Sequence, residues 1–316
     1  MIQLIKGDCL IESDKIKSGS VDLILTDLPY GTIKGLGNGN NIEHGMKSKT
    51  EWDNIIDTDK IMQIANRILR KNGKMILTAQ QPFTNELINK SISNVPFNYS
   101  MIWEKDHFAN ALTAKKAPLN YYEDVLVFSK MNDIELAHPI RSWLKETQEK
   151  SNIFWNDKML HEAYLKSGIA KNIQSAKVIC QHKLDWNYAQ IQEITPKHYD
   201  VLNTFYSFDK TKEELKVIYN DYKKKFASTF NLWEGKKYKS NILKYKKDYT
   251  GDHPTQKPVL LLEDLIKTFS NESDLVVDLT MGSGSTGVAA KNLNRDFIGI
   301  ELDDKYFEIA ENRIND

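Results

Sequence analysis

The sequence predicts an α/β fold: a mostly parallel sheet of seven strands, read in permuted order, with a smaller inserted domain. In the first 130 residues, short apolar runs alternate with helical patterns, which is typical of a parallel sheet covered by helices. A strand leading into a glycine-rich turn, the usual start of a Rossmann-like sheet, lies at residues 275–287, almost at the end of the chain. Because few residues follow this turn, the missing strands have to come from upstream.

Seven short apolar segments are expected to form the strands of this sheet. Each is bounded by turn or polar residues, as buried strands are. Five precede the insert and two follow it. They comprise residues 2–5, 22–25, 74–78, 99–103, 124–128, 275–277 and 297–300.

One helix of the first half has clear boundaries in the sequence. Residues 60–69 carry a helical apolar pattern, and Lys71, Asn72 and Gly73 follow as a basic last turn and a glycine stop. The first domain resumes near residues 253–258, where two prolines forbid a continuous helix.

The middle of the chain has a different character. Strand–helix alternation fades, so residues 131–247 are predicted to form an inserted domain between residues 1–130 and 248–316 of the first domain. Residues 210–248 contain twelve lysines against five acidic residues, which suits contact with phosphates. Inside this stretch, Thr211 and Glu214 form a capping box. The apolar stripe behind it, expected to form a small core rather than a base-stacking surface, consists of Leu215, Ile218, Tyr219, Tyr222 and Phe226.

Composition excludes several classes of protein. The 43 basic and 43 acidic residues balance, so any nucleic-acid surface has to be local. Cys9 and Cys180 are far apart and lack the spacing of metal ligands, so neither a disulfide framework nor a metal site is expected. No stretch is long and apolar enough to span a bilayer, and the N-terminus has no signal-like core. These features predict a cytoplasmic protein without a membrane partner.

The sequence Asp27-Leu28-Pro29-Tyr30 follows the second predicted strand directly, where open α/β sheets keep their ligands. The Asp27 carboxylate and the Leu28 carbonyl are two acceptors for an amino group, and Tyr30 can stack on the ring that carries this group. Pro29 stiffens the turn that holds the acceptors in register. The arrangement is suited to holding an exocyclic amino group. After it, residues 31–50 are expected to form a mobile lid.

Together, the early Asp27 turn and the late glycine turn resemble the amino-group DNA methyltransferases of the β arrangement. The resemblance implies a permuted Rossmann-like methyltransferase sheet, S-adenosylmethionine as cofactor, and methylation of adenine N6 or cytosine N4 in double-stranded DNA. It covers residues 1–130, the catalytic part, and 248–316, the cofactor-binding part; the insert would then be the target-recognition domain. Leu28 stands where the family has a first proline.

The resemblance also assigns the cofactor site. Asp8 is expected on the adenine amino group of the cofactor, with the backbone N–H of Cys9 facing the ring, and Glu301 on the ribose hydroxyls. Thr280 stands where the family has a phenylalanine in the cofactor loop. Phe83 and residues 103–105 fall where the family places residues near the target base. The remaining cofactor-binding residues implied are Lys257, Asp278, Gly282, Gly284, Ser285 and Thr286.

Adenine N6 is the expected target, because Asp27, rather than a serine, stands at the first position of the catalytic sequence, and within this family an aspartate there favours adenine over cytosine. A flipped-out base is required, since a stacked base cannot reach such a pocket. Methyl transfer is then expected to be direct and in line. A second copy of the chain and an associated restriction enzyme are further candidate partners.

Other interpretations remain open at this point. Cytosine N4 is the first alternative target, and an inactive DNA-binding homologue is the second. A methyltransferase acting on protein glutamine places its cofactor loop before the catalytic turn, the reverse of the order here. Taken alone, the glycine turn also fits a dinucleotide fold, and Asp27 also fits a helix cap.

Overall fold

The computed structural model describes residues 1–30, 56–109, 115, 118–132, 139–187, 192–233, 235–248 and 256–315. The chain forms two compact units. The first contains Met1–Asn132 and Ser228–Asp316, and the second contains Asp133–Ala227. The expected lid at residues 31–50 lies outside the described residues.

The first unit is built on an eight-stranded sheet with the order β1-β8-β7-β2-β3-β5-β4-β6. All neighbouring strands pair in parallel except β5, which is antiparallel to both β3 and β4. The predicted permuted α/β sheet is therefore confirmed. The strands are β1 (Ile2–Lys6), β2 (Val21–Thr26), β3 (Leu69–Ala79), β4 (Phe97–Ala109), β5 (Asn120–Ser129), β6 (Ile242–Lys244), β7 (Leu275–Asp278) and β8 (Asp296–Glu301).

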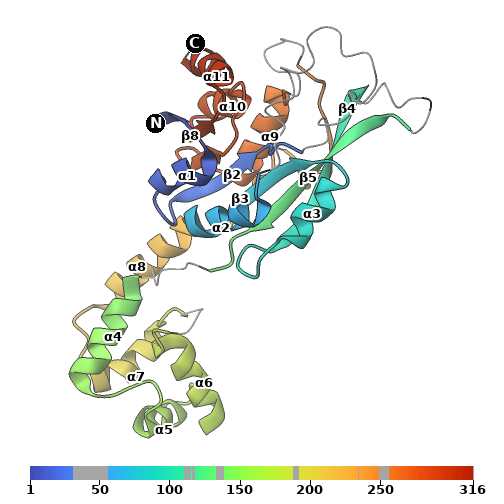
Figure 1. Cartoon of the computed structure of the whole chain (residues 1–316). Coiled ribbons are helices and arrows are strands. Elements are labelled where there is room, and N and C mark those ends of the chain that lie inside the picture. Colours follow the sequence, from blue (N-terminus) through green and yellow to red (C-terminus); the bar gives the residue numbers. More distant parts are fainter. Residues whose placement is uncertain are drawn as a thin grey trace. The chain divides into compact units, whose positions relative to one another are not determined.

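Helices cover both faces of the sheet (Figure 1). On one face, α1, the 3-10 turn η1, α2 and α3 enclose a core that includes Ile24, Met62 and Phe128. On the other, α9, α10 and α11 enclose a core that includes Leu25, Leu265 and Phe297. The helices are α1 (Cys9–Glu12), η1 (Ser13–Lys15), α2 (Thr58–Ile68), α3 (Phe83–Asn89), α9 (Val259–Phe269), α10 (Ser285–Asn292) and α11 (Asp304–Asn315).

The start of α2 follows from its cap, but its end differs from the expected one. Asp57 accepts hydrogen bonds from the backbone N–H groups of Asp59 (3.1 Å) and Lys60 (3.3 Å), which begins the helix. The expected glycine stop at residues 71–73 is wrong: the helix ends at Ile68, and residues 71–73 lie inside β3. Leu69 already pairs with β2, so strand pairing overrides the local stop signal.

Two glycines of the glycine turn are required by the backbone conformation and by the packing of α10. Gly284 has φ +81°, a conformation that favours glycine, and caps the N-terminus of α10. A Cβ on Gly287 would lie 2.3 Å from Cδ1 of Ile314 and 2.8 Å from Cε1 of Phe297. The absence of a side chain at Gly287 therefore lets α10 pack directly on α11 and β8.

The second unit is helical and has its own core. The predicted capping box is confirmed: Thr211 and Glu214 cap α8 reciprocally. Leu215 and Tyr219 on this helix are buried in the core of the unit, as expected for the apolar stripe. The helices are α4 (Pro139–Ser151), α5 (Lys158–Lys166), α6 (Ile173–Leu184), α7 (Pro196–Tyr206) and α8 (Lys212–Lys225).

The insert ends earlier than the expected boundary at residue 247. Residues 228–247 belong to the first unit, because Leu243 pairs with Trp103 when β6 joins the edge of the sheet beside β4. The Lys239 ammonium and the Tyr245 hydroxyl bind Asp264 of α9 at 2.5 Å and 2.9 Å. The second half of the lysine-rich stretch is thus part of the sheet domain. Its strand, β6, is the eighth strand of the sheet, which the apolar pattern did not predict.

Among the described residues, no helix is long and apolar enough to cross a membrane. The same part of the chain contains no cluster of three or more His, Cys, Asp or Glu side chains arranged to hold a metal ion.

We predict that Gly287→Ala lowers the free energy of unfolding by about 1–3 kcal/mol, because the added methyl group overpacks the contact with Ile314 and Phe297. Chemical denaturation followed by circular dichroism measures the change. The control is Leu260→Ala in α9, whose side chain is 64% exposed; its effect should stay within about 0.5 kcal/mol. Equal midpoints for Gly287→Ala and the wild type would contradict the packing argument.

Candidate functional site

Four carboxylates collect at one edge of the sheet. Strands β1, β8, β7 and β2 run parallel, so their carboxyl ends share an edge. Asp27 follows β2 directly, Asp278 ends β7 and Glu301 ends β8, while Asp8 lies two residues beyond β1. In open α/β sheets this edge is where ligands bind. The two sequence turns, far apart in the chain, are therefore brought to one place.

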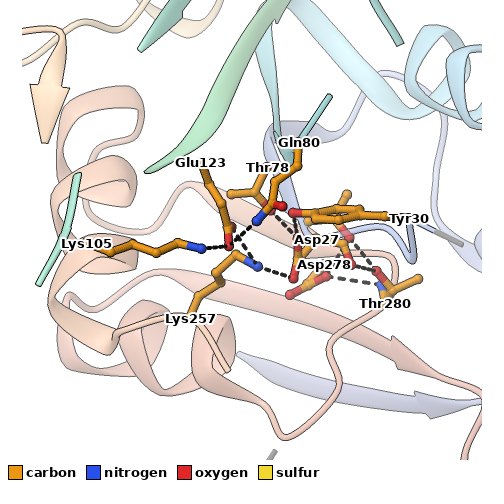
Figure 2. Close-up of polar contacts among 10 residues, drawn as sticks. Asp27, Tyr30, Thr78, Gln80, Lys105, Glu123, Lys257, Asp278 and Thr280 are labelled. Carbon is orange, nitrogen blue, oxygen red and sulfur yellow. Dashed lines mark hydrogen bonds and ion pairs between the residues drawn. The ribbon is translucent and has the colours of Figure 1, made fainter. Parts of the chain in front are cut away.

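The Asp27 carboxylate is held by three side chains (Figure 2). Its Oδ1 accepts hydrogen bonds from the hydroxyls of Tyr30 (2.7 Å) and Thr78. Its Oδ2 forms an ion pair with Nζ of Lys257. The side chain is therefore oriented by contacts from β3 and from the segment before α9.

The other residues of the Asp27 turn lie in different surroundings. Leu28 is 2% exposed and belongs to the core on the face that α1, α2 and α3 cover, so the leucine in place of a proline exposes no apolar surface. The Tyr30 ring lies 5.6 Å from the ring of Phe83, centroid to centroid. Burial, and then the charges of Asp27 and Glu123, raise the pKa of Tyr30 well above its ordinary value, so the hydroxyl stays protonated and donates to Asp27.

Lys257 connects Asp27 to a second buried carboxylate. Its Nζ lies 3.2 Å from Oε2 of Glu123, and Lys105 binds the other oxygen of Glu123 at 2.5 Å. Gln80 donates to the same oxygen at 3.2 Å. Figure 2 shows these groups as a chain of alternating charge that ends at Asp27. Lys257, expected on the cofactor, thus contacts the Asp27 turn, and its expected role in cofactor binding stays a prediction.

The glycine loop is joined to the catalytic turn through threonine hydroxyls. Thr26 donates to Oδ1 of Asp278 at 2.7 Å, and the Thr280 backbone N–H donates to the same oxygen at 3.1 Å. The Thr280 hydroxyl lies 2.9 Å from that of Thr26 and donates to the Asp27 carbonyl at 3.0 Å. The threonine that departs from the family pattern therefore links the two turns.

Glu301 closes the glycine loop onto β8. Its Oε2 accepts the backbone N–H of Gly282 at 2.8 Å, and its Oε1 accepts that of Asp303 at 2.8 Å. Gly282 has φ +51°, which turns its N–H toward the carboxylate. Burial raises the pKa of Glu301, although these N–H groups oppose the shift.

Asp8 and Cys9 lie beside Glu301. The Asp8 carboxylate caps α1 by accepting the N–H of Leu10 at 2.9 Å. Cys9 is 4% exposed, and burial raises its pKa to about 12, with the charges of Asp8 and Glu301 adding to the shift. The thiol is therefore neutral and packed in the core, and any polar role of this residue falls to its backbone.

Ser285 and Thr286 begin α10 and are both buried. The Thr286 hydroxyl hydrogen-bonds the Asp278 carboxylate. Arg313 of α11 binds the Ser283 carbonyl at 2.6 Å and the Ser285 hydroxyl at 3.3 Å. These contacts fix the conformation of the loop from behind, which makes it a rigid element of the site.

Comparison with known proteins identifies the family. Residues 21–312 match the family of N6 and N4 methyltransferases described as DNA methylase. The chain belongs to this DNA methylase family. Membership confirms the predicted amino-group DNA methyltransferase, and the methyl donor of these enzymes is S-adenosylmethionine, as expected.

Two relatives show how far the similarity extends. The type II methyltransferase M2.DpnII of Streptococcus pneumoniae is 31% identical over 199 residues, covering 59% of this chain and 70% of that protein. The DNA adenine methyltransferase YhdJ of Escherichia coli is 26% identical over 316 residues, covering 99% of this chain and 82% of that protein.

Solved structures share the fold. The M1.HpyAVI-SAM complex matches with a TM-score of 0.51 at 19% identity and covers 100% of both chains. The PvuII DNA methyltransferase, described as cytosine-N4-specific, matches with a TM-score of 0.52 at 14% identity, covering 100% of this chain and 86% of that one.

The residues at this edge fit the cofactor of a DNA methylase. The amino group and ribose hydroxyls of S-adenosylmethionine are hydrogen-bond donors, and Asp8 and Glu301 supply carboxylate acceptors at the ends of adjacent strands. Gly282 and Gly284 present backbone without side chains in the loop between Asp278 and α10. The donor and acceptor chemistry thus matches the ligand that the family implies.

Part of the site was missed by the sequence interpretation. Thr78 and Gln80 at the end of β3 and Glu123 in β5 all contact the charged network, yet none was singled out. A signal existed for Glu123, because it is a charged residue next to the apolar run 124–128. Its partners come from distant segments, so the sequence gives no sign of what it binds.

The stretch from Trp103 to Lys105 needs a correction. Trp103 is 2% exposed and donates through Nε1 to the Tyr245 carbonyl at 2.8 Å, so it is a core residue and not a base-contacting one. Glu104 is exposed and pairs with Lys244 at 3.2 Å. Alternation along the strand explains why Lys105 joins the charged network while its neighbour Glu104 faces away.

We predict that Asp278→Asn changes how stability depends on pH. Burial raises the pKa of Asp278 to about 6, against the hydrogen bonds of Thr286 and Thr26. The raised pKa means that the protonated form is favoured in the fold, so the free energy of unfolding falls as pH rises from about 4 to about 6. The loss is on the order of 2–3 kcal/mol, and asparagine, which has no charge, should abolish it. Unfolding midpoints from pH 4 to 7.5 for both proteins measure the difference; parallel curves would contradict it.

Proposed function

We propose that this chain transfers a methyl group from S-adenosylmethionine to the N6 amino group of adenine in duplex DNA. The observation that supports it most directly is the Asp27 carboxylate, held at the sheet edge by Tyr30, Thr78 and Lys257 and joined to the glycine loop by Thr280. The arrangement puts an oriented acceptor beside the cofactor loop, as direct methyl transfer to an amino group requires.

The chemistry asked of Asp27 is to accept hydrogen bonds from the target amino group. The lone pair of an adenine amino nitrogen is delocalised into the ring, so this nitrogen is a poor nucleophile. Acceptors on its hydrogens, the Asp27 carboxylate and the Leu28 carbonyl, favour a pyramidal nitrogen whose lone pair is available. These acceptors act most strongly as positive charge develops, so they stabilise the transition state. When bound, S-adenosylmethionine supplies the methyl group on a sulfonium.

The target base has to leave the helix before it can reach Asp27. Flipping costs about a few kcal/mol, and aromatic contact with the extruded base offsets part of this cost. Tyr30 hydrogen-bonds to Asp27, and its ring lies 5.6 Å from the ring of Phe83. We assign them the apolar wall of the base pocket.

Adenine is favoured over cytosine by the aspartate at the first catalytic position and by the relative named DNA adenine methyltransferase, which matches 99% of this chain. Cytosine N4 is the second candidate, because a cytosine-N4-specific enzyme shares the fold. Incubation with radiolabelled S-adenosylmethionine and mixed-sequence DNA, followed by hydrolysis to nucleosides, shows which base carries the methyl group.

The DNA-facing surface of the sheet domain is assigned to the last residue of β6 and the segment that follows it. Lys244 and Lys246 are exposed there, and Lys247 donates its backbone N–H to Asp106 at 3.1 Å, so the segment follows β4 toward the catalytic edge. Burial and the charges of Lys105 and Lys257 lower the pKa of Lys247, which shows that it lies close to the charged network. We propose that the second unit, Asp133–Ala227, is the target-recognition domain.

Because the proposed substrate is DNA, we also propose a cytoplasmic location. A homodimer and a restriction enzyme partner stay predictions.

We predict that Asp27→Ala lowers methyl transfer at saturating substrates by about 100-fold or more, because the charged acceptor for the amino group is lost. The affinity for S-adenosylmethionine should remain close to that of the wild type, since the Thr280 hydroxyl still reaches the backbone carbonyl at this position. Single-turnover transfer of labelled methyl and calorimetric titration with the cofactor measure the two quantities. Wild-type turnover in this variant would sink the proposed function.

We predict that Lys244→Ala with Lys246→Ala weakens DNA binding and flattens its salt dependence. The slope of log K against log salt should fall by about 0.9 for each phosphate contact removed. The matched control changes Lys236 and Lys237 to alanine; both are exposed in the same lysine-rich stretch but precede β6, away from the edge at which β4 and β2 end. Equal slopes for the two double variants would show that the segment after β6 does not face DNA.

A further inference from the structure

Asp27 does not stand alone at the sheet edge. Its Oδ1 accepts two hydroxyls, those of Tyr30 and Thr78, which occupy both lone pairs of that oxygen. Among the described residues, Oδ2 has Lys257 as its partner and retains one lone pair. The oxygen available to a target amino group is therefore the one that Lys257 holds.

Lys257 is buried between two carboxylates. Its side chain is 7% exposed, and it binds Asp27 on one side and Glu123 on the other. Burial alone disfavours the ammonium, but Asp27 and Glu123 outweigh burial and raise the pKa of Lys257. Lys257 is therefore charged at neutral pH and acts as a fixed cation rather than as a proton donor.

Glu123 is charged as well. Burial opposes its ionisation, but Lys257 and Lys105 together hold its pKa below the ordinary value. The four side chains Asp27, Lys257, Glu123 and Lys105 thus form a row of alternating charge whose formal sum is zero; Asp27, at one end, is 29% exposed, and the other three are buried.

The neutral sum matters for the reaction. A lysine next to Asp27 orients the carboxylate, but its charge also repels the positive charge that develops on the target nitrogen. Glu123, 3.2 Å from Lys257, offsets this repulsion without touching Asp27. Orientation and charge balance are therefore supplied by two different residues.

Resting on the proposed function, we infer that Lys257 is the positioning residue of Asp27 and that Glu123 is its counter-charge. Lys257 holds Oδ2 in the direction of the target amino group, and Glu123 cancels the field of the ammonium. The role assigns Lys257 to the methyl-transfer step and not to cofactor binding.

The test compares Lys257→Met with Lys105→Met. Both remove a buried lysine from Glu123, but only the first removes a contact with Asp27. Lys257→Met should lower kcat by about 100-fold, which is the effect expected when a reacting group is misplaced. KM for DNA and Kd for S-adenosylmethionine should be unchanged. Lys105→Met should lower kcat far less, and Lys257→Arg should recover part of the rate lost in Lys257→Met.

Glu123→Gln is a second test that leaves Lys257 and Asp27 in place. It should lower kcat by about tenfold, because the ammonium then acts unopposed on the developing charge. In the double variant with Lys257→Met, the effect of Glu123→Gln should shrink, since the charge it balances is gone. If Lys257→Met does not fold, as thermal unfolding would show, kcat of Glu123→Gln decides the matter.

Three results would overturn the inference. The first is a wild-type kcat in Lys257→Met or in Glu123→Gln. The second is an equal loss of kcat in Lys257→Met and Lys105→Met, which would indicate a general effect of removing a buried charge. The third is weaker cofactor binding with unchanged kcat at saturation, which would return Lys257 to the cofactor site. Loss of activity in Asp27→Ala alongside any of these leaves the proposed function standing; activity in Asp27→Ala removes both.

Discussion

The site depends on the pairing of strands from the two ends of the chain. β7 lies between β2 and β8, and β1 pairs with β8, so the C-terminal strands β7 and β8 complete a sheet begun by β1 and β2. The register sets which side chains meet. Ile24 lies opposite Val277, which brings Thr26 to Asp278, and Lys6 lies opposite Glu301, which binds the glycine loop through Gly282. A shift of two residues in either pair would separate the two halves of the site.

The second constraint is the cost of burying charge. An ionised group removed from water is destabilising unless it is paired and hydrogen-bonded, and losing one partner leaves the other uncompensated. In the row from Asp27 to Lys105 each buried charge has an opposite neighbour, so the members depend on one another. The Asp27 carboxylate is thus held in one orientation by partners that are themselves paired and buried.

Elements that depend on a short stretch of sequence could be predicted, whereas elements that depend on pairing between distant segments could not. Apolar runs and the Thr211 capping box are local patterns, and the structure has these elements near their expected positions. The strand β6 was missed because three residues in a lysine-rich stretch carry no readable alternation, and its stability comes from pairing with β4. The glycine stop expected after α2 was wrong because pairing between distant strands again decided the structure: pairing with β2 begins at Leu69.

By itself, the sequence determined the permuted α/β sheet, the family, and the acids at the ends of its strands, because each follows from short patterns and their order. Only the tertiary structure decided what those acids contact. Lys257 and Glu123 lie far from Asp27 in the chain, and the contacts from Asp27 to Lys257 and from Lys257 to Glu123 are set by strand register and helix packing. Contacts of this kind join segments that are distant in the sequence and carry no pattern that pairs them. They therefore form only when the strands of the sheet are paired.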